Sequence, residues 1–224
     1  RHCRVTITVR DFSQTVALAE QAGMHYQTVG SPDLGKKGLR YKSCHLLGRV
    51  LGLWRFAWGH HPDLALSHNS YSQAVAARLA GVPVVTLMDY EHQPANHLNF
   101  RLARRVIVPE CFPDESLERY GAANGKSYKY HGVKEQVYLS LFRPDPHFRE
   151  RLGVAPERVL VTVRPPGRTA LYHRFENTLF GQLLQRLNAQ EHVDVILLSR
   201  TPQQRKELEP YLAPHLRLPE EVLD

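Results

Sequence analysis

The residues DLALSHNSYSQAVAARLAGVPVVTLMDYEH, numbered 63 to 92, decide the fold of this chain. An apolar run ends at the polar cluster 67–70, and an Ala- and Leu-rich segment with a 3.6-residue period follows. Gly81 ends that helix and Pro83 cannot extend it, and a second apolar run then reaches the polar cluster 89–92. The stretch therefore predicts a β-α-β unit, whose right-handed crossover joins two parallel strands.

Both polar clusters are expected at the carboxyl edge of one sheet, where open α/β sheets bind their ligands. The expected site residues of this unit are His68, Asn69, Ser70, Asp89, Glu91 and His92. Carboxylates and histidines at such an edge are typical of a site that moves protons.

Strand and helix patterns alternate on both sides of this unit. A strand at 2–10 precedes a helix at 12–22, and further strands are expected at 25–30, 104–110 and 127–132. We therefore expect one doubly wound parallel sheet through about residue 138. Strand ends add four residues to the substrate-binding edge: Asp11, Ser13, Glu110 and Lys134. Asp11 and Ser13 are equally consistent with helix capping.

A second α/β domain is expected from residue 157. The proline-containing segment 139–156 predicts a connector with one short helix, so the domains are 1–138 and 157–224. The fold class is thus α/β with two Rossmann-like domains, whose carboxyl edges are expected to line a cleft. Arginines bind phosphate oxygens bidentately. The expected donor-binding residues of this domain are Arg164, His173, Arg174, Arg200 and Thr201.

Amino-acid composition and net charge limit the classes of binding partner that we expect. The 224 residues are 42% hydrophobic and 23% charged, as in ordinary globular proteins, and the net charge of +7 favours an anionic partner. No motif of a nucleic-acid-binding module occurs, so no nucleic acid is expected. Three widely spaced cysteines, no signal peptide and no long apolar run together predict a cytoplasmic protein. The oligomeric state is not indicated.

A basic loop precedes an aromatic helix expected at 43–58. Its cations are Lys36, Lys37, Arg40 and Lys42, and the helix carries Trp54, Phe56 and Trp58. This composition resembles a peripheral membrane-surface segment, which would place the protein at the inner face of the membrane. One alternative is a core-packing helix after a flexible loop, and another is a loop that closes over a phosphate.

The sequence lacks the motifs of several known catalytic and nucleotide-binding sites. The sequence contains no G-x-S-x-G elbow, P-loop, H-E-x-x-H or G-x-G-x-x-G pattern. Asp89 and His92 lack a third ligand for a metal ion, so the sequence predicts neither a metal nor a cofactor. The chain begins inside a strand and stops before an expected helix. We therefore expect it to be truncated at both ends and inactive as a fragment.

The segments VRDFSQT, ALSHNSYSQAVAARLAGVPVVTLMDYEH, RRVIVPE, YHGVKEQVYLSLFRPDP, VTVRPP, ALYHR and SRTPQQR resemble, in this order, the uncharacterised DUF354 family. The family is placed with glycosyltransferase-B (GT-B) enzymes and UDP-N-acetylglucosamine 2-epimerases, which implies two Rossmann-like domains and a nucleotide-sugar partner. The glycine-rich segment that helps GT-B enzymes bind the donor is absent here.

The likeness to 2-epimerases extends to His173-Arg174-Phe175-Glu176-Asn177, which is similar to a motif of those enzymes. Glu91 matches an epimerase glutamate, but Asn69 stands where the epimerases have a catalytic aspartate. An amide cannot accept a proton as a base, which favours sugar transfer over epimerisation. The expected function is a glycosyltransferase acting on a glycan or lipid-linked acceptor, with Glu91, Asp89 and His92 as catalytic residues. A nucleotide-sugar epimerase or hydrolase and a non-catalytic nucleotide-sugar-binding protein remain alternatives.

Overall fold

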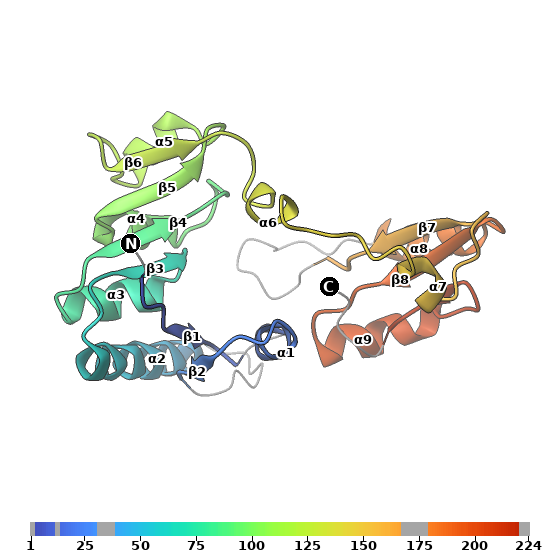
Figure 1. Ribbon diagram of the computed structural model, residues 1–224, viewed down its shortest axis with the longest axis horizontal. Helices are drawn as coiled ribbons and strands as arrows, with labels where there is room; N and C mark the ends of the chain where they lie inside the picture. Colours follow the sequence, from blue (N-terminus) through green and yellow to red (C-terminus); the bar gives the residue numbers. More distant parts are fainter. Residues whose placement is uncertain (1–2, 12–13, 31–38, 167–178, 220–224) are drawn as a thin grey trace. The chain divides into compact units, whose positions relative to one another are not determined.

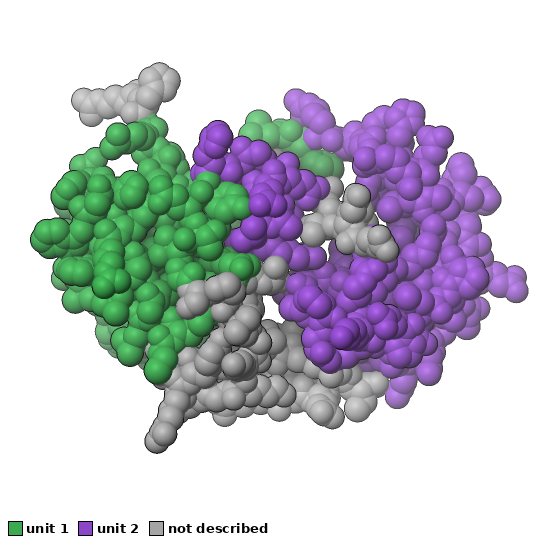
Figure 2. Space-filling model, turned by 90° about the horizontal axis from the view of Figure 1, so that it is seen from below, with its two compact units in different colours: residues 1–12, 26–142 green, residues 13–25, 143–224 purple. Residues whose placement is uncertain are grey.

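The computed structural model describes residues 3–11, 14–30, 39–166 and 179–219. The chain divides into two compact units, which Figure 2 colours separately. Unit 1 comprises Arg1–Phe12 and Tyr26–Phe142, and unit 2 comprises Ser13–His25 and Arg143–Asp224. The expected domain limits, 1–138 and 157–224, stay a prediction.

Unit 1 contains two parallel sheets. The smaller pairs β1 (Ile7–Val9) with β2 (Tyr26–Thr28). The larger has the order β3-β4-β5-β6, with strands Ala65–His68, Val84–Leu87, Arg105–Pro109 and Ser127–Tyr130. Its helices are α2 (Leu39–His60), α3 (Tyr71–Leu79), α4 (Asn96–Leu102), α5 (Asp114–Arg119) and α6 (Gln136–Leu139), all labelled in Figure 1.

The β-α-β unit predicted at 63–92 is confirmed as β3, α3 and β4. Gly81 adopts a φ of 75°, which favours glycine, and its N–H donates to the carbonyl of Arg78 at 3.2 Å. The N–H of Val82 donates to the carbonyl of Ala77 at 2.8 Å, which ends α3 as the sequence predicts. Helix α2 is longer than the expected span 43–58, because it begins at Leu39 and ends at His60.

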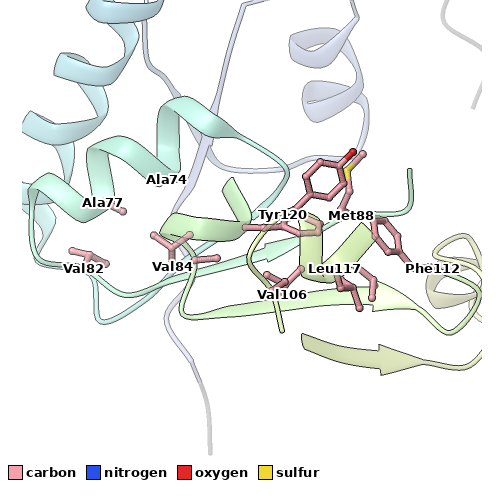
Figure 3. Packing of buried hydrophobic residues seen from close by; sticks show 13 residues of the cluster. Ala74, Ala77, Val82, Val84, Met88, Val106, Phe112, Leu117 and Tyr120 are labelled. Atoms are coloured by element: carbon pink, nitrogen blue, oxygen red, sulfur yellow. The ribbon is translucent and has the colours of Figure 1, made fainter. Parts of the chain in front are cut away.

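The main core of unit 1 lies between α3, α4, α5 and the larger sheet. Val84 and Val106 on adjacent strands have no exposed surface, and neither does Phe100 on α4. Figure 3 shows part of this cluster, including Met88, Phe112 and Tyr120 around the strand ends. Helix α2 packs separately against α3 through Val50, Leu53 and Ala76. The sheet that carries the polar clusters is therefore held rigidly by apolar packing.

Unit 2 contains a three-stranded parallel sheet in the order β7-β8-β9, with strands Val159–Val163, Val193–Leu197 and Leu216–Arg217. Its helices are α1 (Thr15–Gln21), α7 (Phe148–Arg151), α8 (Leu179–Asn188) and α9 (Pro202–Leu208), and α9 continues into a 3-10 turn at Glu209–Tyr211. Parallel sheets in both units confirm the predicted α/β class with Rossmann-like domains.

Two local features differ from what the sequence indicated. Strand β9 was not predicted, and its residues Leu216–Arg217 pair parallel with β8. The connector 139–156 carries one short helix, α7, as predicted, because α6 ends at its first residue, Leu139. Asp11 does not cap α1, since the N-cap of that helix is Gln14. By contrast, Thr201 caps α9, accepting a 3.2 Å hydrogen bond from the Gln204 N–H, and Pro202 follows at the first helical position, where proline is favoured.

A buried charge network fixes the amino ends of β7 and β8. The Asp194 side chain is 6% exposed and accepts hydrogen bonds from Arg158 Nε at 2.5 Å and Arg217 Nη2 at 3.0 Å. Arg158 also donates to the carbonyl of Val193 at 2.7 Å. Asp194 therefore joins three segments that are distant in the sequence.

We expect Asp194→Ala to lower the free energy of unfolding by about 1.5–3 kcal/mol, because it removes charge-assisted hydrogen bonds to two arginines that are only partly exposed. Urea denaturation followed by circular dichroism measures this loss. The matched control is Glu157→Gln, which alters an exposed carboxylate of the same unit and should change the value by less than about 0.5 kcal/mol. Equal effects of the two substitutions would contradict a structural role for the network.

Candidate functional site at the carboxyl edge

The larger sheet of unit 1 brings the sequence-predicted residues of four strand ends to one edge. Because β3, β4, β5 and β6 pair in parallel, all four strands end at the same side. We call this side the carboxyl edge and the opposite side the amino edge. The residues at the carboxyl edge are His68, Asn69, Ser70, Asp89, Glu91, His92, Glu110 and Lys134.

Asp89 is the centre of the most connected group at this edge. Its Oδ1 lies 3.2 Å from His68 Nε2, and its Oδ2 accepts a hydrogen bond from Lys134 Nζ. The Asp89 side chain is 26% exposed, whereas those of His68 and Lys134 are 47% and 41% exposed. One carboxylate therefore holds a histidine and a lysine that both still face solvent.

These contacts shift the ionisation of the group. Burial by itself raises the pKa of Asp89, but the hydrogen bond from Lys134 and the nearby charges of His68 and Lys134 outweigh it and lower that pKa. The hydrogen bond to Asp89 raises the pKa of Lys134. Asp89 is thus a carboxylate and Lys134 an ammonium at neutral pH.

Glu91 and His92 form a second pair. Glu91 Oε1 lies 3.4 Å from His92 Nε2, and the ring of His92 meets that of Tyr90 edge-on, with centroids 5.5 Å apart. The backbone carbonyl of Glu91 accepts a 2.6 Å hydrogen bond from Tyr120 Oη. The backbone beneath this pair is therefore held, while the Glu91 side chain remains 31% exposed.

Glu110 and Lys134 belong to different contacts, although both are at strand ends. Glu110 Oε2 lies 2.6 Å from His131 Nδ1, with both side chains largely exposed. Burial raises the pKa of Tyr130, the last residue of β6, and the charge of Asp89 raises it further. The carboxyl edge thus holds three neighbouring groups, centred on Asp89, Glu91 and Glu110.

Asn69 is buried, unlike the other polar residues at the carboxyl edge. It is 8% exposed and has a φ of 52°, a left-handed conformation that asparagine tolerates. Its Nδ2 donates to Asn96 Oδ1 at 2.9 Å, and its Oδ1 accepts from Asn99 Nδ2. Both ends of the amide are therefore used inside the protein. Ser70 is also turned inward, with its Oγ 3.4 Å from the Oγ of Ser72.

Asn96, Asn99 and Tyr120 are site-supporting residues that sequence reasoning missed. Asn96 has no exposed surface, and its Nδ2 donates to the carbonyls of Tyr90 at 3.0 Å and Glu91 at 3.4 Å. Asn96 and Asn99 are one turn apart in NHLN, and this i, i+3 spacing of amides next to Phe100 was the available signal.

In unit 2 the structure describes only part of the expected phosphate site. Arg164 follows β7 and Arg200 follows β8, and both are exposed at the carboxyl edge of that parallel sheet. Gln204 joins the two connections, since its Nε2 donates to the carbonyl of Pro166 at 3.2 Å and its Oε1 accepts from the Arg200 N–H at 2.9 Å. Arg164 and Arg200 are therefore held on linked loops.

The remaining residues that the sequence predicted are, with one exception, outside the described part of the chain. These are His173, Arg174, Ser13, Lys36 and Lys37. Asp11 follows β1 and is exposed.

The helix with the predicted membrane-surface aromatics is α2. Trp54 packs against the α2–α3 cluster, Phe56 stacks on His60 with centroids 4.0 Å apart, and Trp58 is 60% exposed. In the part of the chain that the structure describes, no helix is both long enough and apolar enough to cross a bilayer.

Comparison with known proteins shows the family to which this chain belongs. The model of the DUF354 family, a protein family of unknown function, matches residues 2–215. The chain belongs to the DUF354 family. An uncharacterised protein of Methanocaldococcus jannaschii is 24% identical over 226 residues, covering 97% of this chain and 63% of its own length.

Solved structures identify the fold of the DUF354 chain. A Listeria monocytogenes protein described as a candidate UDP-N-acetylglucosamine 2-epimerase superposes with a TM-score of 0.70 at 13% identity, covering 98% of this chain and 61% of that one. Anabaena HepE, solved in complex with UDP and glucose, gives a TM-score of 0.53 at 19% identity, covering 91% and 58%. The DUF354 chain thus has a GT-B fold and spans about three fifths of the length of these proteins.

The Asp89–Lys134 pair should make stability depend on pH. A lowered pKa in the folded state means that Asp89 contributes stability above its unfolded pKa of about 3.9, and this contribution is lost as the pH falls through the folded value. We expect Lys134→Gln to lower the free energy of unfolding at pH 7 and to have a smaller effect at pH 3. Urea titrations of both proteins at the two pH values measure the difference.

The control for this prediction is Lys129→Gln. Lys129 lies 2.7 Å from Asp114, whose side chain is 80% exposed, so its loss should cost less than about 1 kcal/mol at pH 7. An effect of Lys134→Gln that is the same at pH 3 and pH 7 would show that the Asp89 contact does not contribute in solution.

Proposed function

We propose that the DUF354 protein transfers a sugar from a nucleotide-activated donor to a hydroxyl group of a glycan or lipid-linked acceptor. The observation that carries this proposal is the position of Asp89 between His68 and Lys134 at the carboxyl edge. That edge is where open α/β sheets bind ligands. The GT-B fold supports a nucleotide sugar as the partner.

His68 is the proposed general base. A neutral His68 that donates from Nε2 to Asp89 Oδ1 keeps a lone pair on Nδ1, and the side chain is half exposed. This nitrogen would take the proton of the acceptor hydroxyl while Asp89 orients the ring. Glu91, paired with His92, is the second candidate base, because its carboxylate is also at this edge.

The diphosphate of the donor is proposed to bind unit 2. Arg164 and Arg200 are exposed beyond the ends of two parallel strands, and Thr201 lies in the same connection as Arg200. Guanidinium groups stabilise the negative charge that develops on a leaving diphosphate. His173 and Arg174 are proposed to contribute to the same binding.

Contact with an anionic membrane is proposed as well, because the net charge of +7 favours anionic partners. An epimerase role has less support, since Asn69 is an amide that is already bonded at both ends. The different activities are separated by the products that they release.

The test of the reaction incubates the full-length protein with UDP-, GDP- and CMP-sugars, with and without an acceptor. Sugar transfer predicts release of free nucleotide that depends on the acceptor. Release without an acceptor would indicate hydrolysis, and conversion of the sugar without release would indicate epimerisation. A thermal shift without turnover would indicate a binding protein. Each of these three results would overturn the transferase proposal.

We expect His68→Gln to lower kcat for transfer by about 10²- to 10⁴-fold, because it removes the base while keeping a polar side chain of similar length. Asp89→Asn should lower kcat by a smaller factor, since it removes only the orienting charge. The matched control is His192→Gln in unit 2, an exposed histidine that should leave kcat unchanged. If Glu91→Gln abolishes transfer and His68→Gln does not, Glu91 is the base instead.

A further inference from the structure

The two edges of the larger sheet of unit 1 carry opposite charge. We compare, at each edge, the terminal strand residues, the connections and the adjoining helix turns. The carboxyl edge has two cations, Lys134 and Lys129, which is paired with Asp114, and six carboxylates: Asp89, Glu91, Glu110, Asp114, Glu115 and Glu135. The amino edge has two carboxylates, Asp63 and Glu118, and six cations: Arg78, Arg101, Arg104, Arg105, Arg119 and Lys126. The proposed sugar transfer gives a role to the charged residues of the carboxyl edge. It gives no role to the six cations of the amino edge.

The cations of the amino edge are not neutralised within the protein. Arg101 donates to the carbonyl of Arg119 at 3.0 Å, and Lys126 donates to the carbonyls of Arg101 at 3.1 Å and Gly121 at 3.3 Å. Arg105 donates to the carbonyl of Gly125 at 3.1 Å. Across the described residues, no carboxylate forms an ion pair with any of the six. Their positive charge is therefore available to an outside anion.

The helix dipole explains the position of only three of the six cations at the amino edge. Arg78, Arg101 and Arg119 lie in the last turns of α3, α4 and α5, where cations interact favourably with the helix dipole. Arg104, Arg105 and Lys126 are outside these helices. Burial lowers the pKa of Lys126, and the charges of Arg101 and Arg78 lower it further. The cations thus repel one another, a cost that binding of an anion would relieve.

Large apolar side chains are exposed at the same edge. Trp58, two residues before the end of α2, is 60% exposed. Leu64, directly before β3, is 50% exposed, and Leu79, the last residue of α3, is 64% exposed. Isolated exposed leucines need no explanation, but a tryptophan and two leucines beside six cations match the composition of membrane-interface segments.

From this juxtaposition we infer that the amino edge of the larger sheet is a docking surface for an anionic phospholipid membrane. Arg78, Arg104 and their neighbours contact the headgroups, and Trp58, Leu64 and Leu79 enter the boundary with the acyl chains. A polyanion such as nucleic acid would match the charge but would leave the leucines without a favourable contact. The inference rests on the proposed membrane contact and names its surface, and it does not depend on the chemistry at the carboxyl edge.

The test is co-sedimentation of the full-length protein with vesicles of phosphatidylcholine, alone or mixed with phosphatidylglycerol. We expect binding to the mixed vesicles only, weakening as salt is added. The double substitution Arg78→Gln with Arg104→Gln should reduce the partition coefficient about 30-fold, because each basic residue near an anionic surface contributes about 1 kcal/mol. The matched control, Arg186→Gln with Lys206→Gln, removes the same charge from exposed positions of unit 2 and should leave binding nearly unchanged.

A second variant tests the apolar contact and avoids any change of charge. The chain has two tryptophans, and Trp54 is the one packed against the core of α2 and α3. Mixed vesicles should shift the fluorescence of the wild type to shorter wavelength, and Trp58→Phe should remove this shift. Unchanged thermal unfolding of both variants excludes misfolding as the cause.

Four outcomes would overturn the inference. Equal losses in the two double variants would show that only total charge matters, and equal binding to neutral vesicles would remove the electrostatic basis. Tight binding to heparin without binding to vesicles would identify a soluble polyanion as the ligand. A larger loss in Lys36→Gln with Lys37→Gln than in the Arg78 and Arg104 pair would place the contact at residues 36 and 37 instead of the amino edge. Sugar transfer is assayed separately with a water-soluble acceptor, so that failure of either proposal can be told apart from failure of the other.

Discussion

Parallel pairing of β3, β4, β5 and β6 is the constraint on which the rest of unit 1 depends. When neighbouring strands all run the same way, each connection must return from the carboxyl edge to the amino edge, and here helices α3, α4 and α5 make that return. Fully buried Val84 and Val106 hold the register, because a slip of one residue would turn them toward the other face. Strand ends and helix ends are thereby sorted to opposite sides, and with them the carboxylates and the arginines.

A second constraint fixes the connection that carries Asp89 and Glu91. Asn96 links this connection to Asn69 at the end of β3, using an amide with no exposed surface. An aspartate at position 69 would face the Oδ1 of Asn96 with an oxygen instead of an N–H, and its charge would be desolvated. The amide is therefore the side chain that this interior accepts. The departure from the epimerase pattern at Asn69 thus follows from the packing of the loop as well as from its chemistry.

The sequence predicted those parts of the fold that local signals determine. Gly81 and Pro83 ended α3, and Thr201 with Pro202 began α9, because helix ends depend on backbone conformation and capping. Strand β9 was missed because two residues are too few for a periodic pattern. The shared edge of His68 and Asp89 could be predicted from parallel topology alone. The contact of Asp89 with Lys134, 45 residues away, could not, because side-chain pairing depends on register and rotamers that no local pattern encodes.

The two carboxylate oxygens of Asp89 contact different residues and have different roles in the proposed site. Oδ1 faces His68 and can orient the ring through one hydrogen bond, while Oδ2 is bonded to Lys134. The ammonium balances the negative charge, so Asp89 directs the imidazole without presenting an unpaired charge to it. A carboxylate bonded in this way is poorly suited to remove a proton from a substrate, since the lowered pKa makes it a weak base. The geometry that makes Asp89 the centre of the group is therefore also the reason to assign proton transfer to its neighbour, His68.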